Sequence, residues 1–131
     1  MEIKNILPIC NRDDYQLDSF LSFLKAIKFQ YRVPTIHIAG TNGKGSICAY
    51  LSQILIESGY KTGQFTSPYV YEFSERIRIN NEMISTQDLK EVTLRVKEAA
   101  DKFAQDDHPT EFELMTAVAF TYFASLVISA C

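Results

Sequence analysis

A glycine-rich stretch with a lysine at its centre constrains the fold of this chain more than any other feature. It consists, in order, of Gly40, Thr41, Asn42, Gly43, Lys44, Gly45 and Ser46. Glycines permit backbone conformations that other residues avoid, and they let the backbone approach a ligand closely. The helix predicted directly after this stretch adds unpaired N–H groups and a partial positive charge. Such a loop favours a polyphosphate ligand, and Lys44 adds a full positive charge.

The stretch matches the general phosphate-loop pattern G-x-x-x-x-G-K-[ST] in part. Gly43 and Lys44 fit, whereas Ile38 stands at the place of the first glycine and Gly45 at the place of the Ser or Thr. The alternative is an ordinary glycine turn between a buried strand and a helix. Three glycines in six residues, with a lysine between two of them, make that alternative a poor explanation.

Hydrophobic periodicity predicts helices and short strands in alternation around this loop. The predicted helices span 13–30, 46–58, 85–103 and 111–124. The predicted strands span 33–39, 61–66, 76–80 and 126–130, with a turn at 80–82 and a short partner strand at 83–84. This alternation indicates an α/β fold with a mostly parallel sheet flanked by helices. His37 is expected to be a hydrogen-bonded structural residue within the first strand.

Composition places these elements in a packed globular domain. The chain has 131 residues, 47% of them hydrophobic, which suffices for a core. A net charge of −3 argues against general nucleic-acid binding. The widely spaced Cys10, Cys48 and Cys131 predict reduced thiols in a cytoplasmic protein. No apolar run approaches the ~18 residues of a membrane span, so no membrane partner is expected.

Three motifs, met in order along the chain, resemble those of one enzyme family. The first is His37–Ser46, the second combines Thr66–Pro68 with Glu75–Asn80, and the third is Thr110–Ala117. Together they resemble folylpolyglutamate synthase and dihydrofolate synthase of the Mur ligase superfamily. The nucleotide loop of that superfamily is itself an offset form of the general pattern, which accounts for the departures noted above. The resemblance implies the N-terminal portion of the P-loop-containing central ATPase domain of a Mur ligase.

The resemblance further implies an ATP-dependent ligase that uses Mg²⁺. Members of the family phosphorylate a carboxylate to an acyl phosphate, which the amino group of L-glutamate then attacks. The acyl group belongs to dihydropteroate or to a reduced folate. These small molecules are therefore the expected partners, and a full-length member is expected to be a monomer.

The resemblance also implies roles for individual residues. Lys44 is the expected catalytic residue, which would bridge the outer phosphates and stabilise developing charge. Ser67 is the expected magnesium ligand, against the alternative of a serine that merely ends a strand before Pro68. The ATP phosphates would be held by Thr41, Asn42, Gly43, Lys44, Gly45 and Ser46. A pteridine pocket would be lined by Thr110, Glu111, Phe112 and Glu113.

Two sets of these residues keep alternative roles. Arg76 and Arg78 are either anion contacts or solvated strand residues. Thr110 could cap the helix that follows it, with Glu111 and Glu113 favoured by the helix dipole. Capping and pteridine contact are compatible, because one residue can serve both.

The chain is predicted to be one incomplete ATP-binding domain over residues 1–131, without the glutamate-ligase domain and the metal-binding glutamate of the family. Two functions from different classes remain: the N-terminal fragment of a ligase, inactive alone, or a non-catalytic remnant that binds only nucleotide phosphate. A small P-loop kinase is disfavoured, because no predicted strand ends in the aspartate that it would need.

The side chains expected to lack packing partners are Val118, Phe120, Phe123 and Leu126.

Overall fold

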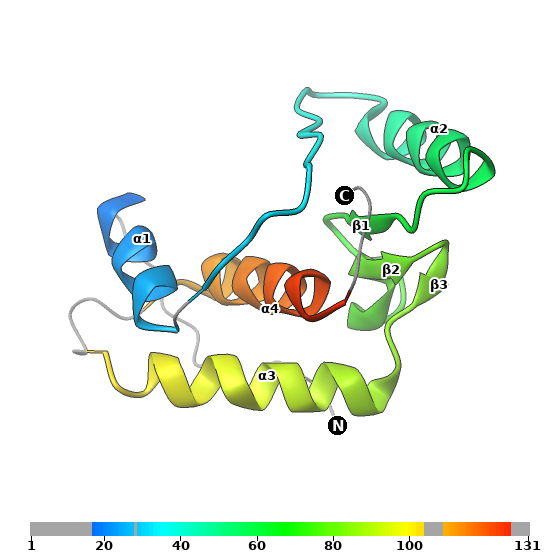
Figure 1. Cartoon of the computed structure of the whole chain (residues 1–131). Helices are drawn as coiled ribbons and strands as arrows, with labels where there is room; N and C mark the ends of the chain where they lie inside the picture. Colours follow the sequence, from blue (N-terminus) through cyan, green and yellow to red (C-terminus); the bar gives the residue numbers. More distant parts are fainter. Residues whose placement is uncertain (1–16, 28, 104–108, 127–131) are drawn as a thin grey trace. The chain divides into compact units, whose positions relative to one another are not determined.

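The computed structural model of the chain divides into two compact units (Figure 1). The described residues are 17–27, 29–103 and 109–126. One unit combines Met1–Tyr31 with Gln87–Tyr122, and we call it the helical unit. The other combines Arg32–Thr86 with Phe123–Cys131, and we call it the loop unit because it contains the glycine-rich loop.

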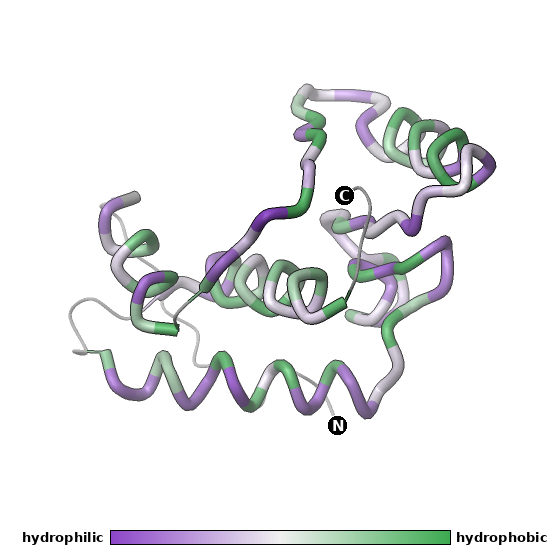
Figure 2. Tube along the Cα trace, viewed as in Figure 1, coloured by the Kyte–Doolittle hydropathy of each residue, from purple (hydrophilic) through white to green (hydrophobic). Residues whose placement is uncertain are grey.

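Three helices supply the described part of the helical unit: α1 (Leu17–Ala26), α3 (Thr86–Ala100) from Gln87 onward, and α4 (Glu111–Ser125) as far as Tyr122. The end of α4, from Phe123, belongs to the loop unit. Helix α3 alternates apolar and polar residues along its length, whereas α4 is apolar on most sides (Figure 2). The buried residues of α3 are Leu89, Val92, Thr93, Val96 and Ala100. A helix that is apolar nearly all round is expected to be buried, and Leu114, Ala117 and Val118 of α4 are indeed buried. The helices predicted over 85–103 and 111–124 are therefore confirmed.

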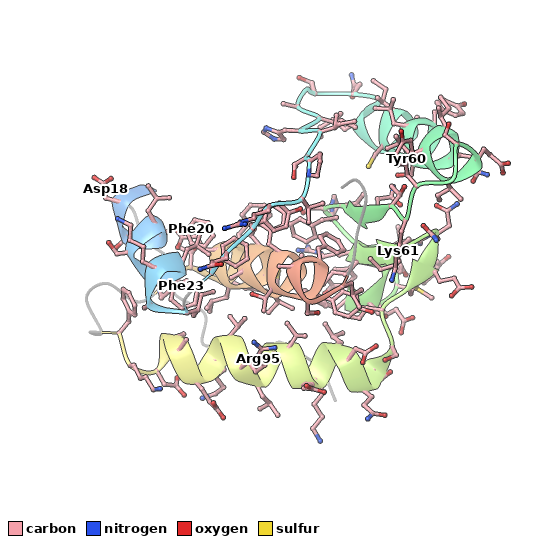
Figure 3. The ribbon with its side chains drawn as sticks, viewed as in Figure 1. Asp18, Phe20, Phe23, Tyr60, Lys61 and Arg95 are labelled. Atoms are coloured by element: carbon pink, nitrogen blue, oxygen red, sulfur yellow. The ribbon has the colours of Figure 1, made fainter. Side chains whose placement is uncertain are left out.

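Aromatic rings pack α1 into the helical unit. Phe23 is fully buried, and its ring meets that of Phe103 edge-on with 5.6 Å between centroids. Phe20 lies on the same side of α1 as Phe23, and Asp18 lies on the other side (Figure 3). The helix predicted over 13–30 is thus confirmed from Leu17 to Ala26, and its first four positions lie outside the described residues.

The loop unit combines one helix with a small antiparallel sheet. Helix α2 spans Lys44–Glu57. The strands are β1 (Gly63–Phe65), β2 (Ile77–Ile79) and β3 (Glu82–Met83), paired in the order β1-β2-β3. Gly63 lies opposite Ile79 and Phe65 opposite Ile77, and the short 3-10 helix η2 (Phe73–Arg76) leads directly into β2. The short strands predicted near 61–66, 76–80 and 83–84 are therefore confirmed.

An Asn-Asn turn joins β2 to β3. Asn80 and Asn81 have φ values of 49° and 68°, which asparagine adopts more readily than most residues. A type I′ hairpin needs positive φ at both central positions. Asn80 also ties the turn to the residue before β1, because its Oδ1 accepts a hydrogen bond from the Thr62 N–H at 2.8 Å. The turn predicted at 80–82 is confirmed.

The strand predicted over residues 33–39 is wrong. These residues form neither helix nor strand, and the sheet β1-β2-β3 does not include them. Their β-branched side chains favour extended backbone, but a strand also needs a neighbouring segment to supply its ladder bonds. His37, expected to be buried, is accordingly exposed. The mixture of helices and sheet keeps the α/β class, but the pairings in the described part are antiparallel instead of parallel.

The apolar side chains expected to be uncovered on α4 are largely covered. Val118 and Phe123 are buried, and Phe120 is half-buried. Gly63 packs so closely on Phe123 that a Cβ added to this glycine would lie 3.1 Å from the ring. Among the exposed large apolar side chains, Phe112 lies in the first turn of α4, and Ile47, Tyr50 and Ile54 lie on α2. Within the described residues, no helix combines the length and the apolar character needed to cross a membrane.

Candidate functional site

The glycine-rich loop turns the chain from the extended segment 33–39 into α2. Gly40 has a φ of 148° and Gly43 a φ of 76°, both in the range that glycine adopts at little cost. A Cβ built on Gly40, Gly43 or Gly45 would meet no heavy atom within 4 Å beyond its chain neighbours. The backbone of the loop is therefore open to a ligand that approaches from outside.

The first turn of α2 offers N–H donors that no side chain caps. Gly43 is the N-cap residue and forms no side-chain cap bond, and the first turn contains no acidic residue. The Ile47 N–H donates to the Gly43 carbonyl at 3.0 Å, so the earlier N–H groups have no helical acceptor. The helix begins two residues before the predicted Ser46, which places Lys44 in its first turn. Orphan donors and the helix dipole together favour an anion at this end.

Lys44 folds back over its own loop. Its Nζ donates hydrogen bonds to the Gly40 carbonyl and, at 3.2 Å, to the Thr41 carbonyl. An ammonium group has three donors, so one remains to be directed at a ligand oxygen. Thr41, Asn42 and Ser46 are exposed along the same loop. The structure thus brings together all six residues that were expected to hold the phosphates.

Two side-chain bridges show how α2 and β1 run relative to each other within the loop unit. Gln64 Nε2 donates to Cys48 Sγ at 3.3 Å. Further along α2, Gln53 Oε1 accepts a hydrogen bond from Asn81 Nδ2 at 2.9 Å. Asn81 belongs to the Asn-Asn turn, which is hydrogen-bonded to Thr62 just before β1. An earlier position on α2 therefore meets a later position on β1, so the helix and the strand are antiparallel.

Ser67 lies two residues after the end of β1, and the antiparallel course of β1 carries the chain toward the start of α2. Its side chain is exposed, and the Ser67–Pro68 peptide is cis. Lys44 lies one helical turn before Cys48, and Ser67 lies three residues after Gln64. Both steps lead to the same end of the unit, so the arrangement is compatible with Ser67 acting beside the glycine-rich loop.

Glu75 holds the backbone of the segment between Ser67 and β2, a role that the sequence analysis missed. Its Oε2 accepts a hydrogen bond from the Val70 N–H at 3.0 Å, and its Oε1 accepts from Tyr71 and Glu72 at 2.9 and 3.0 Å. These hydrogen bonds keep the pKa of Glu75 below its ordinary value of 4.5, and the bond from Val70 has the largest effect. The positive charge of Arg78 lowers the pKa further by a smaller amount. The Glu72–Glu75 spacing is that of a capping box, which was the available signal.

Arg76 packs against aromatic rings of the same segment. Its guanidinium carbon lies 5.0 Å from the ring centroid of Tyr69 and 5.5 Å from that of Phe73, and the residue is 9% exposed. The alternative of a solvated strand residue is therefore wrong for Arg76. Arg78 is half-buried and donates from Nε to the Glu75 carbonyl at 3.2 Å. Both arginines contribute to the packing of this segment.

Thr110 and Glu113 form a reciprocal cap at the start of α4. The Thr110 N–H donates to Glu113 Oε2 at 2.7 Å, and the Glu113 N–H donates to Thr110 Oγ1 at 3.3 Å. The predicted cap by Thr110 is thus confirmed, and Glu113 completes a reciprocal cap that was not predicted. Phe112 stands between them in the sequence and is 57% exposed, so its ring is the most accessible apolar surface of this group.

The predicted site residues are divided between the two units. Residues 41–46 and Ser67 belong to the loop unit, whereas Thr110–Glu113 belong to the helical unit. In the part of the chain that the structure describes, no three His, Cys, Asp or Glu side chains gather as a metal site. A magnesium ion held by the Ser67 hydroxyl would therefore draw its other oxygen ligands from phosphate, water or residues outside that part.

Comparison with known proteins adds independent observations. No protein-family model matches the chain. The dihydrofolate synthase/folylpolyglutamate synthase of Bacillus subtilis (strain 168) is 44% identical over 95 residues, which are 71% of this chain and 22% of that protein. Folylpolyglutamate synthetase from Lactobacillus casei superposes with a TM-score of 0.87 and 31% identity, over 99% of this chain and 35% of that one. The Mycobacterium tuberculosis folylpolyglutamate synthase, complexed with ADP and AMPPCP, gives a TM-score of 0.82 and 28% identity, over 88% and 27% of the two chains.

These superpositions, together with the glycine loop at the start of α2, define the chain as a portion of an α/β protein of the Mur ligase fold. The chain belongs to the folylpolyglutamate synthase/dihydrofolate synthase family, as the resemblance of its three motifs predicts. It spans less than a quarter of the length of the curated relatives that it matches.

Proposed function

We propose that this chain supplies the nucleotide-phosphate site of an ATP-dependent ligase. The reaction joins L-glutamate to dihydropteroate or to a reduced folate through an acyl phosphate. The proposal is carried by the loop at the start of α2, which combines open glycines, uncapped N–H groups and the ammonium of Lys44. The names of the relatives support the choice of acyl substrate, and the ADP and AMPPCP of one relative support a nucleotide.

Within this proposal the loop acts by positioning and by neutralising charge. The N–H groups of Lys44, Gly45 and Ser46 donate to phosphate oxygens, and Gly43 lets the backbone approach them. The ammonium of Lys44 lies over the loop and offers positive charge where the outer phosphates carry negative charge. Stabilisation of charge that develops on the transferred phosphoryl group is the main demand in this class of reaction.

Ser67 is the residue that we propose for Mg²⁺. Its hydroxyl is uncharged, and the residue is exposed two positions after β1, which suits a metal that keeps several water and phosphate ligands. The bound ion would neutralise charge on the phosphates. This chain would contribute one oxygen ligand, the Ser67 hydroxyl. The backbone that follows Ser67 is held by the hydrogen bonds to Glu75.

Phe112 is the residue of its group that we propose to contact the pteridine. The side chains of Thr110 and Glu113 are engaged in the cap of α4, and Glu111 is half-exposed beside them. A pteridine is a flat aromatic ring system, and an exposed phenyl ring offers it an offset stacking surface. The cap then serves to orient the turn from which Phe112 projects.

The alternative function is a non-catalytic remnant that binds nucleotide phosphate alone. It is favoured by one observation: in the part of the chain that the structure describes, no three metal-binding side chains lie close enough together to hold an ion. Both functions predict phosphate binding at the glycine-rich loop. They differ in whether the loop can support turnover once the rest of a family protein is supplied.

The test places residues 1–131 in the Bacillus subtilis relative in exchange for the stretch that they match. We expect ADP release that depends on glutamate and acyl substrate, and a loss of at least about a hundredfold on Lys44→Ala. The melting temperature should change little, because Lys44 is outside the core and its hydrogen bonds reach only carbonyls of the adjoining loop. Lys61→Ala is the matched control, since Lys61 lies beyond the other end of α2 (Figure 3).

The outcomes separate the two functions. The 131-residue chain alone should release no ADP, because phosphoryl transfer relies on all parts being held together. A fusion that binds nucleotide without turnover would favour the remnant. Full turnover in the Lys44→Ala fusion would contradict the role given to the loop.

A further inference from the structure

Asn42 directly precedes Gly43 in the glycine-rich loop, at the turn that leads into α2 (Figure 1). It is the one asparagine in the chain that a glycine follows. The side-chain amide of an asparagine can be attacked by the backbone nitrogen of the next residue. A glycine at that place leaves the nitrogen accessible, because it has no Cβ. The dipeptide is therefore a candidate for spontaneous deamidation, unless the folded loop hides it.

Both groups that would react are open in the folded chain. Asn42 and Gly43 are exposed, and a Cβ built on Gly43 would meet no heavy atom within 4 Å beyond its chain neighbours. Within the described residues, the Asn42 side chain has no hydrogen-bond partner, and the Gly43 N–H has no backbone acceptor. Deamidation at this place therefore has no hydrogen bond to break first.

The start of α2 favours the negative charge that the reaction develops. As the Gly43 nitrogen attacks, charge passes to the amide oxygen of Asn42, and nearby donors and dipoles stabilise such charge. The N–H groups of the first turn lack helical acceptors, and the helix dipole is positive at this end. The ammonium of Lys44 is hydrogen-bonded to carbonyls of the same loop, and the first turn contains no acidic residue. The setting that favours a phosphate therefore also favours the charged intermediate of deamidation.

We propose that Asn42 and Gly43 form a modification site, at which Asn42 deamidates spontaneously and closes the loop to phosphate. The Gly43 nitrogen forms a bond to Cγ of Asn42, and the bond from Cγ to Nδ2 breaks. The Nδ2 group leaves as ammonia with the proton from the Gly43 nitrogen, and a cyclic imide remains. Water then opens the imide at either carbonyl, which gives aspartate or isoaspartate. The net change exchanges an amide for a carboxylic acid, with water consumed and ammonia released.

Either product places a carboxylate where a phosphate would bind. The carboxylate can accept hydrogen bonds from the uncapped N–H groups at the start of α2, as acidic side chains do at helix N-termini. It also repels a polyphosphate and offsets the positive charge of Lys44. Isoaspartate in addition lengthens the backbone of the loop by one carbon atom. The affinity for nucleotide should therefore fall, a consequence that rests on the proposed function.

Asn80 and Asn81 are internal controls in the same unit. Both are exposed, like Asn42, but asparagine and glutamate follow them instead of glycine. Asn80 Oδ1 accepts a hydrogen bond from the Thr62 N–H, and Asn81 Nδ2 donates one to Gln53. Their side chains are held, and the nitrogen that would attack each of them belongs to a residue with a side chain. They should therefore stay largely unmodified while Asn42 is converted.

The experiment incubates the 131-residue chain without nucleotide in mildly alkaline buffer and follows each asparagine by peptide mass spectrometry. Deamidation adds about 1 Da, and electron-based fragmentation distinguishes isoaspartate from aspartate. Modification of Asn42 should exceed that of Asn80 or Asn81 at least about tenfold. A parallel sample in guanidinium chloride gives the rate in the unfolded chain. The folded chain should modify Asn42 no more slowly, because the start of α2 favours the charged intermediate.

Two variants connect the modification with binding. Asn42→Asp carries one product from the start, and it should bind AMPPCP with Mg²⁺ at least about tenfold more weakly than the freshly prepared parent. Its melting temperature should not fall, because an acidic side chain is favoured at a helix N-terminus. Asn42→Gln keeps an amide on a longer side chain that closes a ring less readily. The parent should lose affinity during incubation in step with its gain in mass, whereas Asn42→Gln should keep its own starting affinity.

Three results would overturn the proposal. The first is an Asn42 that is modified no faster than Asn80 and Asn81, and the second is an Asn42 that is modified more slowly in the folded chain than in the unfolded one. The third is an Asn42→Asp chain that binds AMPPCP as tightly as the fresh parent. A fresh chain that binds no nucleotide but is modified rapidly at Asn42 would contradict the proposed function and would still support the modification site.

Discussion

At the scale of single residues, the glycine-rich loop is shaped by its own side chains before any ligand is considered. Lys44 holds the carbonyls of Gly40 and Thr41, and Gly43 caps the helix through its backbone alone. The loop therefore keeps its shape without using the N–H groups that a phosphate would need. A site organised in advance loses less entropy when its ligand binds.

Gly45 provides a test that separates folding from binding. It lies in the first turn of α2, and no positive φ requires glycine there. Gly45→Ala should raise the free energy of unfolding by about 0.5 kcal/mol, because alanine restricts the unfolded chain. It should also weaken nucleotide binding, since a Cβ obstructs close approach to the backbone. Urea unfolding and a nucleotide titration check both, and unchanged affinity would show that phosphates do not approach Gly45.

Glu75 predicts a dependence of stability on pH. Its pKa in the folded chain lies below the ordinary value of 4.5. Its contribution is therefore fully present above that value and is lost as the pH falls through the lowered folded-state pKa. Glu75→Gln should be less stable than the parent chain at pH 7, and the difference should shrink toward pH 3.

Urea unfolding at both pH values measures this effect. The control is Glu82→Gln, which removes an exposed carboxylate from β3 of the same unit. A difference between Glu75→Gln and the parent that stays constant from pH 7 to pH 3 would contradict the role of the Glu75 carboxylate.

At the scale of elements, helices were predictable because their information is local. The apolar spacing of α3 and the acid-rich start of α4 lie within each segment, and the structure confirms both. The Asn80–Asn81 turn was predictable for the same reason, since its residue types suit its φ values. The glycine loop likewise combines its six expected residues at one helix start, because they are adjacent in sequence.

Strand pairing and helix exposure could not be predicted in this way. The residues 33–39 have a strong local preference for extended backbone, but pairing depends on a segment elsewhere in the chain. Helix α2 has an apolar face, but the pattern does not tell which side the rest of the unit covers. Arg76 was missed as a packing residue for a similar reason, because Tyr69 and Phe73 stack on it only after the segment folds.

The cap of α4 gives a prediction at this scale. Thr110→Ala removes the acceptor of the Glu113 N–H and should lower the free energy of unfolding by about 1 kcal/mol. Thr110→Ser keeps the hydroxyl and should stay close to the parent. Thermal unfolding of both variants is the measurement. Equal stability of Thr110→Ala and Thr110→Ser would show that this cap contributes nothing measurable.

At the scale of the whole molecule, the proposed function rests on one loop of this chain. The loop unit carries the glycine-rich loop and Ser67, and the helical unit carries the turn with Phe112. The relatives that match this chain are several times longer than the matched stretch. The central claim is accordingly narrow: the start of α2 binds nucleotide phosphates.

The most direct test is a titration of the ¹⁵N-labelled 131-residue chain with AMPPCP and Mg²⁺, followed through backbone amide signals. Weak binding is expected, with saturable shifts concentrated at residues 41–46, because their N–H groups lie at the open helix start. The shifts should vanish in Lys44→Ala and persist in Lys61→Ala. Signals of residues 41–46 that stay unmoved at millimolar nucleotide, or that shift equally in Lys44→Ala, would contradict the account.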